Sequence, residues 1–294
     1  MSQKVSHEEL ILIIFEDFDS FFTDKQYAKY KFNHKSDFKV YRTGSKSYLN
    51  IPEDFKYLDI DDDVSKLYVL FMVAHELAHL TNQHLHYNDK HKLDSQTIEM
   101  WADYFGAKIA MSILIFGSKF NKLLTINFMD RDKTLENIFK AIIEKLYPVF
   151  QNADNSGKYL MSYNRTSTIF AGIAAFLTRS DMWIKRKFSN KDHAEIGAAW
   201  GYTINLQLLK SNLVSQMNMG TGYSLEHEDI RELAENVYTI HNQLQNGNNG
   251  PLLKGLSWKY SYILDTYYEK FNPNPLLKQK VQEMVDKVGW NVQI

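Results

Sequence analysis

The sequence predicts a mainly helical α+β fold in which a small β-hairpin or sheet accompanies many helices. Apolar residues recur with the 3.6-residue period of helices over most of the chain. Residues 38–41 and 47–51 are two short extended stretches, separated by a turn around Gly44 and closed by Pro52. The chain has 294 residues, of which 44% are hydrophobic, so it can bury a sizeable core.

The first segment of the chain predicts an amphipathic helix rather than a secretion signal. Acidic residues, among them Glu8, Glu16 and Asp19, interrupt its apolar residues, whereas a signal peptide needs an uninterrupted apolar stretch. No later window approaches the ~20 consecutive apolar residues of a membrane span. We therefore expect a cytoplasmic protein without a membrane span.

Charge and cysteine content narrow the classes of function. The 34 Lys and Arg residues nearly balance the 35 Asp and Glu residues, so the chain offers no electrostatic reason to bind a polyanion, and no nucleic-acid partner is expected. The sequence contains no cysteine, which excludes disulfides and thiolate metal ligands. Any metal site must therefore consist of histidine, aspartate and glutamate side chains.

A long helix is expected to begin at the acidic run of residues 61–63, because acidic side chains favour the N-terminus of a helix. Its apolar run contains His75-Glu-Leu-Ala-His79, which is the pattern HExxH. Two histidines four residues apart project from the same face of a helix, so one metal ion can reach both. A zinc hydrolase uses three protein ligands and keeps a fourth position for water, so a third ligand is required.

A second helix, expected to start with Ser95 as its cap, supplies the remaining carboxylates. It follows a polar loop, and an antiparallel return of the chain would bring Glu99 to the metal as the third ligand. Asp103 lies one helical turn further along the same face, and metal-bound histidines usually donate their free ring N–H to such a carboxylate. Glu76 is expected to act as the general base that takes a proton from the activated water.

These two helices resemble the helix-loop-helix of the gluzincin metallopeptidases. VAHELAHL followed by IEMWADYFGAKIA is similar to the motifs of thermolysin-like and HtpX-like enzymes, over about residues 65–110, and the chain is also similar in length and motif order to Lit-type phage-exclusion peptidases. The resemblance implies a zincin-like core that binds Zn²⁺ and hydrolyses a peptide bond of an intracellular protein. It implies the same roles for the site residues, with His75, His79 and Glu99 as ligands, Glu76 as base and Asp103 as outer partner.

Peptide hydrolysis also needs a strand edge that binds the substrate backbone. It further needs a hydrogen-bond donor for the oxyanion. In the zincin arrangement the substrate backbone adds to an edge strand beside the motif helix, and the strand at residues 47–51 is our candidate. His193, at the expected start of a later helix, is the candidate donor. HtpX-like and Lit-type enzymes carry a His-Pro segment downstream, whereas Ala194 follows the histidine here, and a surface residue near a helix cap is the alternative interpretation. Further candidate donors are Tyr104, Tyr163 and Arg186.

The remainder of the chain predicts a C-terminal helical bundle. Helices are expected near residues 132–150, 158–178, 193–211, 225–245, 252–271 and 275–287. We expect a zincin-like metal-binding core at residues 1–120 and a helical region at 121–294 that completes the site and can act as a lid or sensor, with a single domain across both as the alternative. His84, His86 and His91 are interpreted as solvated loop residues rather than as a second metal site.

Three functions are compatible with this pattern. The first is an active zinc endopeptidase that cleaves an intracellular protein. The second is a sensing or binding module of zincin fold with structural zinc and no cleavage, but structural zinc is commonly closed by four protein ligands and has no use for the base Glu76. The third is a protease effector or toxin of phage defence that is silent until triggered.

Overall fold

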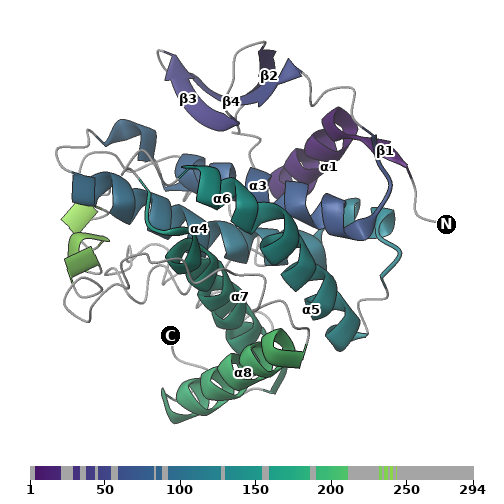
Figure 1. The fold of residues 1–294 in the computed structure, drawn as a ribbon, viewed down its shortest axis with the longest axis vertical. Helices are drawn as coiled ribbons and strands as arrows, with labels where there is room; N and C mark the ends of the chain where they lie inside the picture. The colour runs from purple at the N-terminus through teal and green to yellow at the C-terminus, as the bar shows by residue number, and fades with distance from the viewer. Residues whose placement is uncertain are drawn as a thin grey trace, which may run out of the picture.

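The computed structural model describes residues 4–20, 29–33, 38–43, 46–53, 59–82, 84–87, 92–126, 130–153, 159–185 and 190–210, with short pieces between 232 and 243. Helices dominate this part of the chain, and two small sheets accompany them (Figure 1). The prediction of a mainly helical fold with a small β element is confirmed. The helices expected at 252–271 and 275–287, and most of the helix expected at 225–245, lie outside the described residues.

Helix α3 (Asp63–Thr81) carries the HExxH motif. Asp62 caps its N-terminus, because its side chain accepts a hydrogen bond of 2.8 Å from the backbone N–H of Ser65. The helix start that the acidic run predicts is therefore confirmed. The next helix, α4 (Lys92–Phe116), begins before Ser95, so that serine lies inside the first turn and the prediction that it caps the helix is wrong.

Most of the remaining helices lie around α3 and α4, whereas α8 packs on α7 (Figure 1). They are α1 (His7–Asp19), η1 (His84–His86), η2 (Phe120–Leu123), α5 (Arg131–Lys140), the π-helical segment η3 (Ala141–Leu146), α6 (Tyr147–Ala153), α7 (Ser162–Lys185) and α8 (Asn190–Lys210). The first helix and the helices expected near 132–150, 158–178 and 193–211 are thus present, with ends that differ by a few residues.

Glycines allow the central helices to approach closely. A Cβ atom on Gly106 of α4 would lie 2.8 Å from Cα of His75, so only glycine permits the contact between α4 and the turn of α3 that carries His75. A Cβ on Gly172 of α7 would collide with the carbonyl oxygen of Tyr104 in α4. α4 therefore approaches both α3 and α7 to backbone distance.

The strands form two small sheets. They are β1 (Val5–Ser6), β2 (Lys29–Asn33), β3 (Lys39–Thr43), β4 (Lys46–Pro52) and β5 (Asp59–Ile60). β1 pairs with β5, and the other three have the order β2-β4-β3, in which β4 is antiparallel to β3 and parallel to β2. The predicted hairpin is confirmed as β3 and β4, whereas the prediction that residues 47–51 form an edge strand is wrong. β4 is paired on both sides, so β3 is the edge of this sheet that approaches α3.

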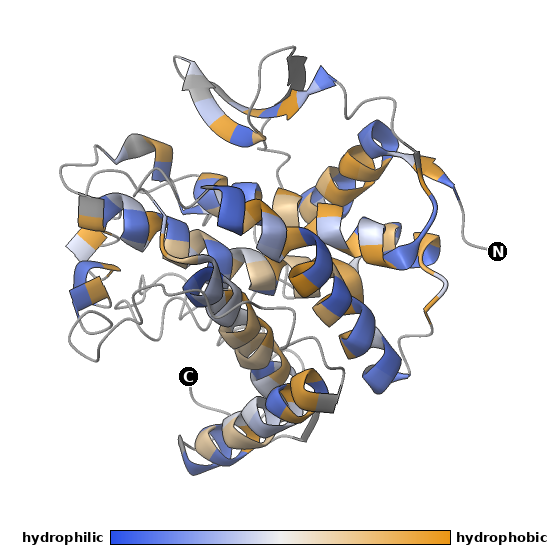
Figure 2. Ribbon diagram, in the orientation of Figure 1, coloured by the Kyte–Doolittle hydropathy of each residue, from blue (hydrophilic) through white to orange (hydrophobic). Residues whose placement is uncertain are grey.

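Buried apolar side chains of the described residues form one cluster, to which both motif helices and the later helices contribute. The described residues of the expected regions 1–120 and 121–294 therefore share one hydrophobic core. In Figure 2 most helices carry both hydrophobic and hydrophilic residues, as helices that bury one face do. Among the described helices, none combines the length and the apolar character that crossing a membrane requires.

Candidate metal centre

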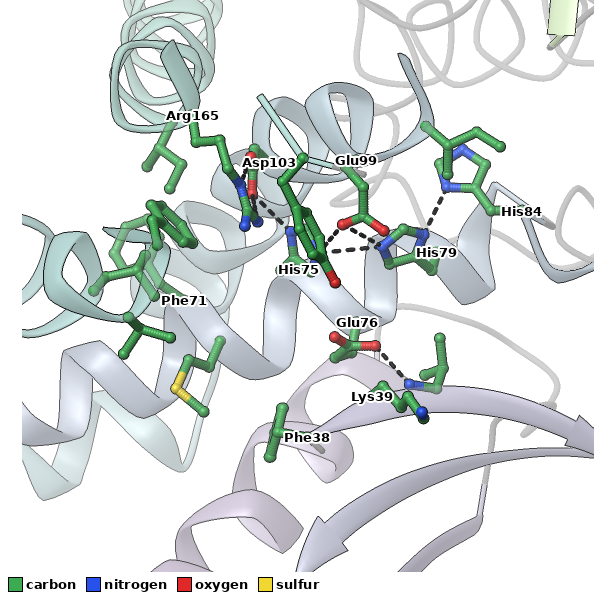
Figure 3. Close-up of a pocket in the computed structure, with 18 of the residues that line it drawn as sticks. Phe38, Lys39, Phe71, His75, Glu76, His79, His84, Glu99, Asp103 and Arg165 are labelled. Atoms are coloured by element: carbon green, nitrogen blue, oxygen red, sulfur yellow. Dashed lines mark hydrogen bonds and ion pairs between the residues drawn. The ribbon is translucent and has the colours of Figure 1, made fainter. Parts of the chain in front are cut away.

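Three side chains with metal-binding atoms converge between α3 and α4 (Figure 3). Nε2 of His75 lies 3.1 Å from Nε2 of His79. Oε2 of Glu99 lies 3.3 Å from the first of these nitrogens and 3.6 Å from the second. The three donor atoms all lie within 4.8 Å of one another, and within the described part of the chain no fourth residue joins the group. This group can hold a metal ion, as the spacing of the motif predicts.

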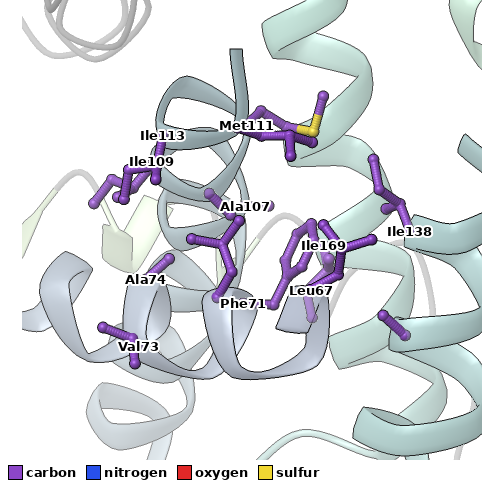
Figure 4. Packing of buried hydrophobic residues seen from close by; sticks show 14 of the residues in the cluster. Leu67, Phe71, Val73, Ala74, Ala107, Ile109, Met111, Ile113, Ile138 and Ile169 are labelled. Atoms are coloured by element: carbon purple, nitrogen blue, oxygen red, sulfur yellow. The ribbon is translucent and has the colours of Figure 1, made fainter. Parts of the chain in front are cut away.

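Buried apolar side chains of α3 and α4 pack next to the residues of this group. Figure 4 shows Phe71 and Ala74 of α3 near Ala107 of α4, and all three side chains are at least nine-tenths buried. Ala74 precedes the first histidine of the motif, and Ala107 lies two turns past Glu99. Close packing on both sides of the ligands limits their freedom to move, so the donor atoms are held near one another before an ion binds.

Burial and charge act in opposite directions on Glu99. Its side chain is only 7% exposed, and burial by itself favours the neutral carboxylic acid. His79 and His75 outweigh burial and hold the pKa of Glu99 well below its usual range. Glu99 is therefore an ionised carboxylate, which is the form that binds a cation.

The other ring nitrogen of His75 faces a second carboxylate. Nδ1 of His75 lies 2.8 Å from Oδ1 of Asp103, whose side chain is 1% exposed. Burial lowers the pKa of His75, but the carboxylates of Asp103 and Glu99 outweigh it and raise that pKa to about 10. Asp103 thus occupies the place expected of the outer partner that orients the first histidine.

Arg165 of α7 is a site residue that sequence reasoning does not identify. Its Nε and Nη2 donate hydrogen bonds of 2.8 Å and 2.9 Å to the two oxygens of Asp103. Its guanidinium carbon lies 3.8 Å from the ring centroid of Phe150 and 4.8 Å from that of Tyr159. Burial raises the pKa of Asp103, but Arg165 and His75 together lower it below its usual value. A buried chain of charged contacts therefore runs from α7 to the metal-binding group.

The second histidine of the motif has a different outer partner. Nδ1 of His79 lies 3.0 Å from Nδ1 of His84, and His84 is only 4% exposed. The prediction that His84 is solvated is therefore wrong, because the turn after α3 folds back against the site. His91 and the side chain of His86 lie outside the described residues.

Glu76 contacts the edge strand β3. One carboxylate oxygen, Oε2, accepts a hydrogen bond of 2.6 Å from the backbone N–H of Val40. Burial raises the pKa of Glu76 above its usual value, although His75, His79 and the Val40 N–H each oppose this effect. A carboxylate with a raised pKa and a fixed position has the properties of a general base.

The metal-binding group and Glu76 line one cavity of about 910 Å³. Apolar side chains from several helices form part of the same wall, among them Phe71, Leu146, Phe150 and Ile169. This volume is large enough for a small molecule or for several side chains of a peptide.

Of the four expected oxyanion donors, the three that the structure describes do not line this cavity. His193 is exposed near the start of α8 and Tyr163 is 48% exposed on α7, and neither is among the described residues that line the cavity. Tyr104 packs beside Trp101 with ring centroids 5.5 Å apart, and burial raises its pKa to about 12. Arg186 lies outside the described residues. Tyr159 does line the cavity, although no sequence pattern distinguishes it.

Comparisons with protein-family models, with curated proteins and with solved structures find no match.

Proposed function

We propose that this chain is a zinc-dependent endopeptidase that hydrolyses a peptide bond of an intracellular protein. The observation that carries the proposal is the convergence of His75, His79 and Glu99 in one cavity with Glu76. Two imidazoles and one carboxylate are a known donor set of catalytic zinc sites. The resemblance of the two motif helices to gluzincin peptidases supports the same assignment.

The spacing of the donor atoms fits zinc. Ligand atoms about 2.1 Å from a tetrahedral ion lie about 3.4 Å from one another, and the three distances here are 3.1, 3.3 and 3.6 Å. When bound, zinc supplies Lewis acidity that polarises a carbonyl oxygen and lowers the pKa of a water molecule. The three protein ligands would leave a coordination position open for substrate or water.

Glu76 is the proposed proton carrier. It takes a proton from the attacking water and delivers it to the leaving amine as the C–N bond breaks. The hydrogen bond from Val40 holds one carboxylate oxygen in place, which leaves the other oxygen to receive the proton. The raised pKa of Glu76 lies closer to neutral pH than the pKa of an exposed glutamate, so Glu76 accepts a proton more readily.

Strand β3 is the proposed edge for an extended substrate. The N–H of Val40 points towards Glu76 and therefore away from the paired strand β4. Backbone groups of alternate residues in an antiparallel strand point to the same side, so the backbone of Arg42 has the same outward direction. A peptide that pairs with this edge would lie beside the base and the ligands.

Tyr159 is the proposed donor to the oxyanion. Tyr159 lines the same cavity as Glu76 and the metal-binding group, and its ring centroid lies 4.8 Å from the guanidinium carbon of Arg165. Arg165 uses its guanidinium for Asp103. A phenolic O–H at the cavity wall is a suitable neutral donor for developing negative charge.

The alternative, a binding module with structural zinc, is less well supported. Structural zinc commonly has four protein ligands, whereas the described residues provide a group of three beside a large cavity. A buried general base next to this group has no role in a purely structural site.

Comparison of wild type with Glu76→Gln tests the proposal. Each protein is incubated with a lysate of the host cells, and new peptide termini are identified by mass spectrometry. We expect new termini with wild type and their loss with Glu76→Gln, while zinc content stays at about one ion per chain. Glu136→Gln changes an exposed glutamate of α5 and should cleave like wild type. Identical termini with wild type and Glu76→Gln would favour the binding module instead.

A further inference from the structure

His84 is a buried histidine that the proposed reaction does not use. It follows α3 in the turn η1, and its ring meets that of His79 edge to face, with centroids 5.1 Å apart and an interplanar angle of 75°. This arrangement aims one ring nitrogen at another rather than stacking the rings. The distance between the two Nδ1 atoms, 3.0 Å, is that of a hydrogen bond.

The roles of the two nitrogens follow from the position of His79. Its Nε2 faces the metal-binding group, 3.1 Å from Nε2 of His75 and 3.6 Å from Glu99. A histidine that binds a metal through Nε2 carries its proton on Nδ1. Nδ1 of His79 must therefore donate, and Nδ1 of His84 must accept, which requires that His84 be neutral with its proton on Nε2.

We propose that His84 is a positioning residue for the metal ligand His79. It accepts the Nδ1–H of His79, and this hydrogen bond fixes both the tautomer and the ring orientation of the ligand. The inference rests on the proposed metal site formed by His75, His79 and Glu99. His84 itself is not a ligand, because its bonded nitrogen lies behind His79, on the side opposite the nitrogen that faces the ion.

The turn that carries His84 is held in place by buried hydrogen bonds. Nδ2 of Asn82 donates to the carbonyl of Ala78 at 2.7 Å, and Nε1 of Trp101 in α4 donates to Oδ1 of Asn82 at 3.0 Å. The backbone N–H of Tyr87 donates to the carbonyl of His84 at 3.0 Å. Asn82 therefore joins the end of α3 to α4 two residues before His84, and the hydrogen bond from Tyr87 holds the backbone of η1.

This arrangement makes the two histidine ligands unequal. The outer partner of His75 is the anionic carboxylate of Asp103, which is itself paired with Arg165. A carboxylate partner increases the basicity of a ligand histidine, whereas a neutral imidazole does so less. His84 thus orients His79 without adding negative charge, and the bound ion keeps more of its positive charge.

Metal affinity measured on wild type and three variants tests this inference. Zinc competition with a chromophoric chelator is measured for wild type, His84→Phe, His84→Gln and His7→Phe. His84→Phe keeps a ring of similar size but removes the acceptor, so we expect its zinc affinity to fall about 10–100-fold. The amide oxygen of His84→Gln can accept the same hydrogen bond and should restore most of the loss. His7→Phe, in α1, removes an imidazole outside the cavity and should bind zinc like wild type.

Nuclear magnetic resonance of the zinc-loaded wild-type protein gives a second readout that needs no variant to fold. With ¹⁵N-labelled histidine we expect a coupling between the Nδ1 nuclei of His79 and His84 across the hydrogen bond. Unchanged affinity of a folded His84→Phe, or absence of this coupling, would overturn the inference while leaving the metal site intact. Failure of wild type to bind zinc would overturn both this inference and the proposed function.

Discussion

Replacement of Arg165 by methionine tests the buried chain of charges behind the metal site. Arg165 and Asp103 have side-chain exposures of 6% and 1% and share two hydrogen bonds. Removal of one partner from a buried ion pair typically costs about 3–5 kcal/mol, because it leaves a charge buried without compensation. His75 also faces Asp103 and is protonated in the metal-free protein, since its pKa is about 10. We therefore expect a loss near the lower end, about 3 kcal/mol.

The assay is unfolding of the metal-free protein by urea in the presence of a chelator, with circular dichroism as the measure of the folded fraction. Lys140→Met is the matched control, because Lys140 and Glu136 form an equally short pair of 2.7 Å with exposures of 38% and 48%. Exposed helical pairs of this kind contribute only about 0.3–0.5 kcal/mol. The double variant Arg165→Met/Asp103→Asn should lose less than Arg165→Met alone, since it removes the uncompensated carboxylate. Equal small losses for Arg165→Met and Lys140→Met would refute the reasoning.

Two further predictions concern the reaction and the metal. Tyr159→Phe should lower kcat about 100-fold with unchanged zinc content, because its hydroxyl is the proposed donor to the oxyanion. His193→Ala changes a residue outside the cavity and should leave initial rates on a cleaved peptide unchanged. The opposite pattern would restore His193 as the donor. Zinc binding at about pH 8 should release roughly one proton, because His75, with a pKa of about 10, must become neutral to bind. Apparent zinc affinity should therefore rise with pH, and calorimetry in buffers of different ionisation enthalpy measures the release; no release would show that His75 is already neutral.

The residues of the candidate metal site can be predicted from the sequence because their arrangement is mostly local. The helical period alone brings His75 and His79 to one face, and α3 begins where its acidic residues indicate. Glu99 requires only that the next helix return beside the first, and the close contact at Gly106 fulfils this. The same period carries Asp103 one turn further, to the other side of His75.

Partners from elsewhere in the chain could not be predicted in the same way. Arg165 lies 62 residues after Asp103. No local sequence pattern distinguishes it from a solvated arginine, because its contact with Asp103 depends on the packing of α7 on α4. His84 looks like a loop histidine until the Asn82 turn folds it back on His79. The substrate edge depends on the pairing of β2 with β4, which makes residues 47–51 a central strand. In each case the decisive contact is tertiary.

An anomalous-scattering crystal structure of the zinc-loaded protein, measured on both sides of the zinc absorption edge, tests whether zinc binds at the proposed site. We predict one zinc peak about 2.0–2.2 Å from Nε2 of His75, Nε2 of His79 and a carboxylate oxygen of Glu99, with a fourth position not filled by protein. A peak at other residues would contradict the proposed site. A fourth protein ligand on the ion would make the zinc structural and contradict the proposed peptidase.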